Sequence, residues 1–172
     1  MEVSWGWCGL RRSEAGLTRS TLPQSTRDAA SKLVAACGQA PSSAPAWDDR
    51  DALLCEAGEL LKSYFAGERP DFALPLDLSG LWRFSRDVLR ACARIPRGET
   101  RSYGEVAAMA GAPRAARAAG QALARNPLPI FVPCHRVIGA DGKLAGFGGG
   151  LEMKRRLLAL EESGGQSSRQ AG

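Results

Sequence analysis

Residues 126–139 read NPLPIFVPCHRVIG, and this segment gives the clearest structural prediction for the C-terminal half of the chain. The apolar run at residues 130–132 predicts a short buried strand that ends at Pro133. Cys134 follows at once, and an apolar pair and a glycine-rich turn come next, at residues 137–142. We therefore expect a strand and a tight turn to form a rigid platform that presents the Cys134 side chain.

The chemistry of this segment centres on Cys134 and on His135, the single histidine of the chain. A cysteine is a strong nucleophile as its thiolate, and a neighbouring imidazole or cation lowers the thiol pKa from about 8.5 toward neutrality. His135 directly follows the cysteine, and Arg136 follows the histidine. A bare Cys-His pair is weak evidence, because most buried cysteines are only small apolar side chains. With its neighbours it makes Cys134 a candidate nucleophile.

The chain has five cysteines, an odd number at irregular spacing. No two of them have the two-residue gap of a metal site or a redox motif, and there is one histidine. We therefore expect no disulfide framework, no metal and no cofactor. The cysteines before Cys134 are predicted to be small buried residues, namely Cys8, Cys37, Cys55 and Cys92.

Two short helices are predicted just upstream of this segment. Ser102 followed by Glu105 is a capping box, which starts a helix over residues 103–110. A turn with Gly111 leads to a second helix over residues 113–125, with proline at its first position. Two such helices joined by a glycine-containing turn are typical of a helix-turn-helix.

The second of these helices consists mainly of small residues and arginines. A helix face of alanine and glycine lets the backbone approach a surface closely, as the minor groove of DNA, about 6 Å wide, requires. The alternative is that the alanines pack against the core while the arginines are solvated. The small residues expected on the exposed face are Ala115, Ala116, Ala118, Ala119, Gly120 and Ala122, beside Arg114, Arg117 and Arg125.

Charge is distributed unevenly along the chain, whose net charge is +5. Residues 81–125 contain nine arginines against three acidic residues, whereas residues 1–80 contain eight basic residues against eleven acidic ones. A basic central segment beside an acidic N-terminal one predicts a surface for a polyanion in the C-terminal half.

The N-terminal residues predict a small antiparallel sheet. Apolar and polar residues alternate over residues 3–7, which is typical of a half-buried strand. A turn at residues 14–16 leads to a return strand over residues 17–22, and Pro23 closes the hairpin.

A loop and a long helix are expected next. The loop covers residues 38–47, which are rich in proline, serine and glycine. Asp48 or Asp49 caps the helix, and Gly67 ends it. Its apolar stripe is Leu53, Leu54, Ala57, Leu60, Leu61, Tyr64 and Phe65. Residues 68–79 then read as an extended linker.

Two further helices are predicted in the C-terminal half. The first has apolar residues at helical spacing from Leu81 to Cys92 and ends at residues 96–98 (PRG). The second covers residues 151–161. The side chains expected to be buried in that last helix are Leu151, Met153, Leu157, Leu158 and Leu160.

These elements predict an α/β protein in two parts. Residues 1–79 form a small N-terminal α/β domain with a sheet and a helix, and residues 80–162 form a mostly helical domain that contains the helix-turn-helix and Cys134. Residues 163–172 form a disordered tail. No apolar run approaches the roughly 20 residues of a membrane-spanning helix, and the first residues lack the pattern of a signal peptide. We expect an intracellular protein with no membrane contact.

The string PCHRV at residues 133–137 resembles the active-site motif of the O6-alkylguanine-DNA alkyltransferases, also called the methylated-DNA–protein-cysteine methyltransferase family. The resemblance includes RAAG at 117–120, Asn126-Pro127, and GFGGGL at 146–151. It is continuous from about Leu81 to Glu161, and a weaker likeness covers residues 64–67 and 72–76.

The resemblance implies direct reversal of DNA alkylation damage. The alkyl group of O6-alkylguanine, or of O4-alkylthymine, is transferred irreversibly from a flipped nucleotide to Cys134, once per protein molecule. The partner is double-stranded DNA, bound by a monomer through the minor groove. The location is the cytoplasm (nucleoid) in a prokaryote or the nucleus in a eukaryote.

The resemblance also implies roles for matching residues. His135, oriented by Glu161, draws off the thiol proton through a water molecule. Tyr103 presses on the phosphate of the flipped nucleotide and donates to the departing guanine, Arg117 replaces the extruded base, and Asn126 braces the turn before the acceptor. The guanine pocket is formed by Val137, Phe147, Gly148 and Gly149. The remaining DNA contacts are Ser102, Arg114, Ala116, Ala118, Gly120, Arg125 and Arg136.

The chain departs from the family pattern at Arg97, where an aromatic residue usually follows the proline of the IPxG turn, and this change bears on the DNA contacts. The start of the helix at residues 81–84 is a looser match. Some members carry zinc in the N-terminal region, but this chain has no histidine there and gives no basis for such a site.

Two other functions fit parts of the sequence. A non-catalytic helix-turn-helix module could sense lesions, but relatives of that kind lack the acceptor cysteine that is present here as Cys134. A Cys-His hydrolase or transferase acting on small substrates would turn over many times without DNA, and it leaves the arginine-rich helix unexplained. Reaction with methylated DNA distinguishes these two functions from that of an alkyltransferase, because only the alkyltransferase becomes methylated at Cys134.

Overall fold

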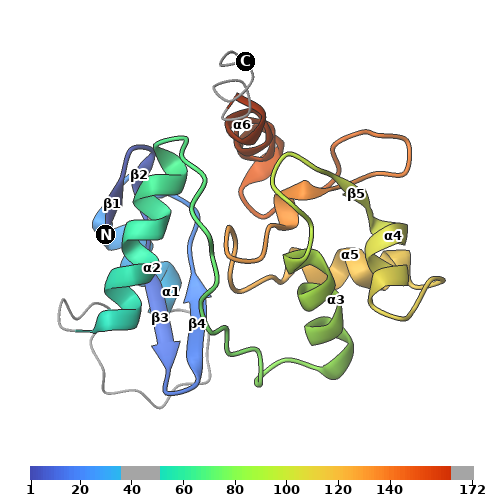
Figure 1. The fold of residues 1–172 in the computed structure, drawn as a ribbon, viewed down its shortest axis with the longest axis horizontal. Coiled ribbons are helices and arrows are strands. Elements are labelled where there is room, and N and C mark those ends of the chain that lie inside the picture. The colour runs from blue at the N-terminus through green and yellow to red at the C-terminus, as the bar shows by residue number, and fades with distance from the viewer. Residues whose placement is uncertain (36–50, 164–172) are drawn as a thin grey trace, which may run out of the picture. The chain divides into compact units, whose positions relative to one another are not determined.

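The computed structural model describes residues 1–35 and 51–163. Its contacts divide the chain into two compact units, Met1–Leu78 and Ser79–Gly172. The first unit combines small sheets with helices and the second is mostly helical, which confirms the α/β class (Figure 1). The predicted loop at 38–47, the cap at Asp48 or Asp49, Cys37 and residues 164–172 of the predicted tail lie outside the described residues.

The first unit begins with two hairpins. One replaces the single strand predicted over residues 3–7, and the other confirms the predicted turn near residues 14–16 and a return strand, which ends at Ser20 and not at residue 22. Strands β1 (Glu2–Val3) and β2 (Gly6–Trp7) pair antiparallel across a tight turn. The prediction was wrong because Gly6 adopts φ +130° and lies so close to the backbone that an added Cβ would be 2.4 Å from the Gln24 carbonyl oxygen. Strands β3 (Leu10–Ser13) and β4 (Gly16–Ser20) form the second hairpin.

Two helices complete this unit. Helix α1 (Arg27–Ala35) was not predicted, although Thr26 caps it through a bond from Ala29 N to its hydroxyl oxygen. Helix α2 (Ala52–Phe65) is capped by Asp51, whose side chain accepts from Leu54 N at 3.1 Å. The apolar stripe of α2 is buried at Leu54, Ala57, Leu61, Tyr64 and Phe65, whereas Leu53 and Leu60 are half-buried.

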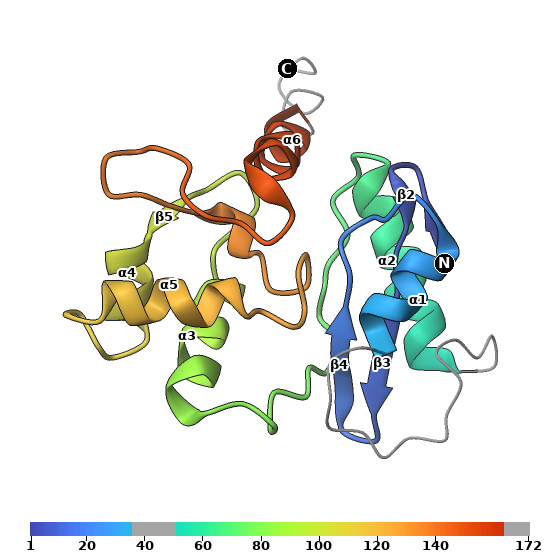
Figure 2. The same cartoon turned by 180° about the vertical axis from the view of Figure 1, so that it is seen from behind.

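The second unit starts with helix α3 (Arg83–Ala93), which packs against helices α4 (Tyr103–Met109) and α5 (Ala116–Ala124) (Figure 2). The apolar side of α3 is buried at Val88, Leu89 and Cys92. Burial of each large apolar side chain contributes about 1.5–3 kcal/mol. The predicted helix-turn-helix is therefore held on a packed base.

Helix α4 confirms the predicted capping box. The Ser102 hydroxyl accepts from Glu105 N at 3.2 Å, and Ser102 N donates to Glu105 Oε2 at 2.6 Å. Strand β5 (Arg101–Ser102) enters this helix and pairs in parallel with β6 (Val137–Ile138). The pairing joins the start of the helix-turn-helix to the segment that follows Cys134.

Helix α5 starts three residues later than predicted. Ala115 N donates to the Ala112 carbonyl at 2.9 Å, so that Pro113 lies inside a turn and the helix begins at Ala116. Proline fits the second position of such a turn because its φ is already fixed near −65°. Arg114 consequently belongs to the turn and not to the helix.

Residues 130–132 do not form the predicted strand. Ile130 and Phe131 occupy a turn, Ile130 adopts φ +76°, and Pro129 and Val132 form an isolated bridge. A positive φ is costly for a β-branched residue, so this turn must be held by its surroundings. The chain then forms a short 3₁₀ helix, η1 (Cys134–Arg136), which replaces the predicted turn at the cysteine.

The last helix, α6 (Gly150–Ser163), buries Leu157 as predicted but not the other four residues of the predicted face. Leu151 is 44% exposed, and Met153, Leu158 and Leu160 are half-buried. The buried residues are Lys154, Leu157 and Glu161, which follow one another at three- and four-residue spacing. Ser163, the predicted first residue of the tail, still belongs to this helix. Within the described residues, no helix is long and apolar enough to cross a membrane.

Candidate functional site

Cys134 lies at the first position of η1 and is 8% exposed. The turn before it is organised by Asn126, whose Nδ2 donates to the Val132 carbonyl at 2.9 Å and to Cys134 Sγ at 3.1 Å. Asn126 Oδ1 accepts from Leu128 N at 3.0 Å. One amide thus bridges both ends of the turn that contains Ile130 and also contacts the sulfur.

The thiol of Cys134 experiences opposing influences. Burial raises its pKa, while the Asn126 amide, the Lys154 charge and the backbone N–H groups of Cys134 and His135 act in the opposite direction and favour the thiolate. Burial prevails, so the pKa of the Cys134 thiol lies above its ordinary value in the protein without DNA. The expectation that the neighbouring imidazole lowers this pKa is not met, because a neutral histidine supplies no charge.

His135 is fully buried behind the cysteine, with Nε2 2.8 Å from Glu161 Oε1. Burial lowers the pKa of His135 more than the Glu161 hydrogen bond and charge raise it, so the ring is neutral near pH 7. A carboxylate only accepts, so Nε2 carries the ring proton and Nδ1 is left as the acceptor. This is the tautomer that a proton acceptor needs.

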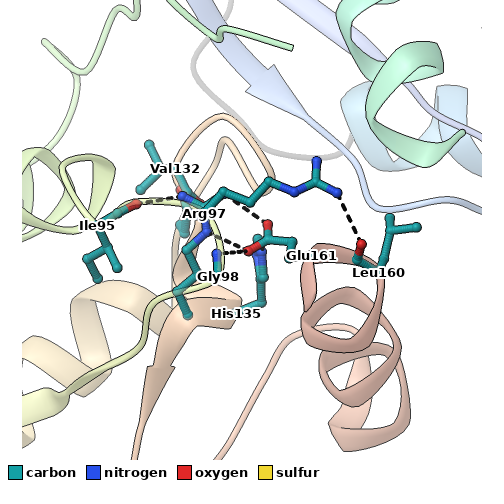
Figure 3. Close-up of polar contacts among 9 residues, drawn as sticks. Ile95, Arg97, Gly98, Val132, His135, Leu160 and Glu161 are labelled. Atoms are coloured by element: carbon teal, nitrogen blue, oxygen red, sulfur yellow. Dashed lines mark hydrogen bonds and ion pairs between the residues drawn. The ribbon is translucent and has the colours of Figure 1, made fainter. Parts of the chain in front are cut away.

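Glu161 is the centre of a buried polar cluster (Figure 3). In addition to His135, it accepts from Arg136 Nε at Oε2 and from Arg136 Nη2 at Oε1, both at 2.9 Å, and from Gly98 N at 3.5 Å. Burial alone would raise the pKa of Glu161, but the bonds from His135 and Arg136 outweigh burial and keep this pKa below its ordinary value. The carboxylate is therefore ionised while it orients the ring.

Arg136 lies in this cluster. Its side chain is buried, and Nη1 donates to the Ile95 carbonyl at 2.5 Å in addition to the Glu161 bonds. Three of the five N–H groups of the guanidinium donate to Glu161 and to the Ile95 carbonyl. Its burial and these bonds favour a role of Arg136 in holding Glu161 over the predicted contact with DNA.

Lys154 is a site residue that was not singled out from the sequence. It is completely buried, and Nζ donates to the carbonyl oxygens of Val137 at 2.6 Å and Ala145 at 2.8 Å. Nζ also lies 5.9 Å from the centre of the Tyr103 ring. The available signal was its spacing, because Lys154 precedes Leu157 by three residues and Glu161 by seven on one helix face.

Tyr103 is held between the helix-turn-helix and the glycine-rich loop. Its hydroxyl lies 3.4 Å from the carbonyl oxygens of Ala145 and Gly146, to either of which it can donate. Gly120 of α5 lies beside the ring, since a Cβ added there would be in van der Waals contact with it at 3.5 Å. Burial, together with Cys134 and Cys92, raises the pKa of Tyr103, so the phenol stays protonated.

The exposed face of the helix-turn-helix is partly the one predicted. Arg114, Arg117, Ala118 and Arg125 are exposed, and Ser102, Ala115, Ala116 and Gly120 are half-buried. Ala119 and Ala122 are buried, contrary to prediction, because they pack the helix onto its base together with Leu123. The exposed surface of α5 therefore combines small side chains with arginines.

The residues predicted for the guanine pocket occupy two segments. Val137 is fully buried in β6, and Phe147 is half-buried. Gly148 and Gly149 are exposed in the loop that precedes α6. The Lys154 bonds to the Val137 and Ala145 carbonyls tie these segments together.

The other cysteines are not comparable to Cys134. Cys8 and Cys92 are buried as predicted, and burial raises the pKa of Cys8 to about 12. Cys55 was predicted to be buried but is only half-buried. Within the described ranges, no group of three His, Cys, Asp or Glu side chains is placed to hold a metal ion.

The sequence and the fold of this chain are similar to those of known proteins. The family model for the DNA-binding domain of 6-O-methylguanine DNA methyltransferase matches residues 83–163. The methylated-DNA–protein-cysteine methyltransferase of Mycolicibacterium paratuberculosis is 56% identical over 115 residues, which cover 67% of this chain and 69% of that protein. The chain belongs to the methylated-DNA–protein-cysteine methyltransferase family.

Other members of this methyltransferase family give the same picture. The protein of that name from Methanosarcina acetivorans is 49% identical over 117 residues, covering 68% of this chain and 74% of that protein. The crystal structure of Mycobacterium tuberculosis OGT in complex with DNA is 41% identical, covers 95% of this chain and 91% of that chain, and has a TM-score of 0.74. The likeness at the level of the fold thus extends over both units.

Proposed function

We propose that this chain is a single-turnover methylated-DNA–protein-cysteine methyltransferase, which moves the alkyl group of O6-alkylguanine in DNA to Cys134. Two contacts carry the proposal. Asn126 Nδ2 donates to Cys134 Sγ at 3.1 Å, and Glu161 holds Nε2 of His135, the next residue in the chain, at 2.8 Å. These residues have the types that a nucleophile, a base and a group that orients the base require.

The first step is removal of the thiol proton. Because burial favours the neutral thiol of Cys134, a base is needed at the moment of reaction. The neutral ring of His135 accepts the proton at Nδ1 through a water molecule, and the ionised Glu161 stabilises the imidazolium through Nε2. Asn126 and Lys154 stabilise the negative sulfur.

The second step is transfer of the alkyl group. Cys134 Sγ attacks the alkyl carbon, and the bond from that carbon to O6 breaks as the carbon–sulfur bond forms. The bonding electrons return to the guanine, which becomes the ordinary lactam on taking up one proton, so that the proton lost by the thiol is balanced. Tyr103, kept protonated by burial, is the proposed donor. The product is a thioether, which His135 cannot hydrolyse, and each molecule therefore reacts once.

DNA binding follows from the helix-turn-helix. A guanine stacked in a duplex cannot reach a sulfur that is 8% exposed, so the nucleotide must be flipped out at a cost of a few kcal/mol. The exposed and half-buried small side chains of α5 support close approach to a minor groove, and Arg117, exposed on the same helix, is proposed to fill the vacated stack. Arg114 and Arg125 are the proposed phosphate contacts.

The flipped base is proposed to be recognised by the backbone groups of Val137 and Gly148. O4-alkylthymine is the second proposed substrate.

The remaining assignments follow from this role. We propose that residues 80–162 carry both DNA binding and alkyl transfer, because all the proposed functional residues lie there. The protein acts as a monomer wherever the cell keeps its DNA, which is the cytoplasmic nucleoid in a prokaryote and the nucleus in a eukaryote.

The test is mass measurement after reaction with duplex DNA that contains O6-methylguanine. We expect the peptide with Cys134 to gain one methyl group in a one-to-one ratio of protein to lesion. Cys55→Ser is the matched control and should react like the wild type, whereas Cys134→Ser should leave the lesion intact. An unmodified Cys134 peptide with retained binding to the lesion would instead identify a lesion sensor, and many turnovers without DNA would identify a Cys-His enzyme.

A further inference from the structure

The turn after α3, residues 95–98 (IPRG), contacts the Glu161 cluster at three successive points. The Ile95 carbonyl accepts from Arg136 Nη1 at 2.5 Å, Arg97 Nη2 donates to the Leu160 carbonyl at 3.0 Å, and Gly98 N donates to Glu161 Oε2 at 3.5 Å. Figure 3 shows Arg97 extended over Glu161 toward Leu160. This turn therefore holds both the carboxylate and the helix that carries it.

The bond from Arg97 is made at the C-terminal end of α6. Leu160 lies in the last turn because α6 ends at Ser163, and its carbonyl also accepts from the Ser163 hydroxyl at 3.2 Å. A cation at this end also interacts favourably with the helix dipole. The guanidinium of Arg97 consequently fixes the peptide group that directly precedes the Cα of Glu161.

The direction of this side chain differs from what the sequence suggested. Arg97 replaces an aromatic residue of the family pattern, and a charge there was expected to change DNA contacts. The side chain is half-buried, and Nη2 is directed at a helix end inside the unit. Its effect is therefore on the position of Glu161.

We propose that Arg97 is a positioning residue, which holds the last turn of α6 so that Glu161 stays within hydrogen-bond distance of His135. The inference rests on the proposed function. Arg97 acts through the backbone at Leu160, whose carbonyl accepts from Nη2 at 3.0 Å. When this bond is lost, Glu161 gains freedom relative to His135, and a small displacement of an orienting group can slow a reaction about tenfold or more.

The test compares Arg97→Leu and Arg97→Lys with the wild type. The matched control is Arg94→Gln, since Arg94 is an exposed arginine of the same stretch that donates to the Met109 carbonyl at 3.2 Å. Methyl transfer to Cys134 is followed under single-turnover conditions across pH, well below the melting temperature of each variant. Binding to undamaged duplex DNA is measured in parallel.

We expect Arg97→Leu to slow methyl transfer about tenfold and to leave DNA affinity unchanged within about twofold. Because Glu161 raises the pKa of His135, a weakened contact lowers that pKa, and the rising limb of the pH profile, where His135 loses its proton, should move to lower pH. Arg97→Lys should recover most of the rate, because an ammonium group can donate to the same carbonyl. The other charged and titratable groups near the sulfur, Lys154, Tyr103 and Cys92, are the same in all variants.

Two results would overturn the inference. One is an unchanged rate and pH profile in Arg97→Leu, even if the variant melts at a lower temperature, because that indicates a purely structural role. The other is a loss of DNA affinity that accounts for the whole loss of rate. Failure of the proposed function is distinguishable from both, because the wild type itself would then not methylate Cys134.

Discussion

The Nζ atom of Lys154 lies 2.6 Å from the carbonyl oxygen of Val137, although a lysine is rarely buried completely as this one is. The bond joins α6 to the strand that follows the acceptor cysteine. It also places a positive charge near Cys134, where it favours the thiolate. Lys154 thus contributes to the fold and to the reactivity of the sulfur.

Replacing Lys154 with methionine should therefore raise the pKa of the Cys134 thiol and slow methyl transfer. The free energy of unfolding should also fall by about 1–3 kcal/mol, because the buried Val137 carbonyl loses its donor. The measurement is the pH dependence of Cys134 alkylation by iodoacetamide without DNA. Arg155→Met on the same helix is the control, since its side chain is 63% exposed. An unshifted pH profile in Lys154→Met would contradict the assigned role.

Asn126 is expected to act on both the turn and the sulfur, and two substitutions separate these effects. Asn126→Asp keeps an acceptor for Leu128 N but loses the donor to Cys134 Sγ and brings a negative charge beside it. Asn126→Ala loses all three bonds but adds no charge. We expect the aspartate variant to show the slower thiol reaction, and the alanine variant to lose about 1–3 kcal/mol of unfolding free energy. The rate of thiol alkylation tests the first expectation, and chemical denaturation tests the second. Equal rates of thiol alkylation in the two variants would argue against the contact with the sulfur.

Arg117 is expected to matter only when a base has to leave a stacked duplex. Arg117→Ala should slow repair of O6-methylguanine in duplex DNA by about tenfold or more, since the vacated stack is then left unfilled. Cys134 of the same variant should react with iodoacetamide at the wild-type rate, and the variant should lose much less activity on a lesion in single-stranded DNA. Arg90→Ala, an exposed arginine of α3, serves as the control. An equal loss on both DNA substrates would place Arg117 outside the flipping step.

The sequence predicted the elements whose signals are local. The Ser102–Glu105 capping box is visible within four residues, and the apolar spacing of α3 identifies its buried side at Val88, Leu89 and Cys92. The helix-turn-helix and the acceptor cysteine followed from such signals and from the family motif. What the sequence could not settle depends on contacts between distant residues.

The turn before Cys134 illustrates this limit. An apolar run of three residues favours a strand, but the Asn126 side chain and the Pro129–Val132 bridge impose a turn with Ile130 at positive φ. In the same way, Arg136 reads as a surface charge until Glu161, 25 residues later, is brought beside it. The apolar residues of α6 predicted the burial of Leu157 correctly but missed Lys154 and Glu161, whose burial depends on polar partners outside the helix.

The buried pair His135–Glu161 predicts how stability depends on pH. Because the folded protein lowers the pKa of His135, the unfolded chain binds a proton there first, and stability falls as pH drops below the ordinary histidine value of about 6.5. The lowered pKa of Glu161 acts in the same direction, since its stabilisation is present above about pH 4.5 and is lost below it. Melting temperatures should thus decline from pH 7 to pH 5 and more steeply below pH 4.5. His135→Gln, which cannot take up a proton, should reduce the decline between pH 7 and pH 5, and an unaltered slope in that variant would show that another group causes it.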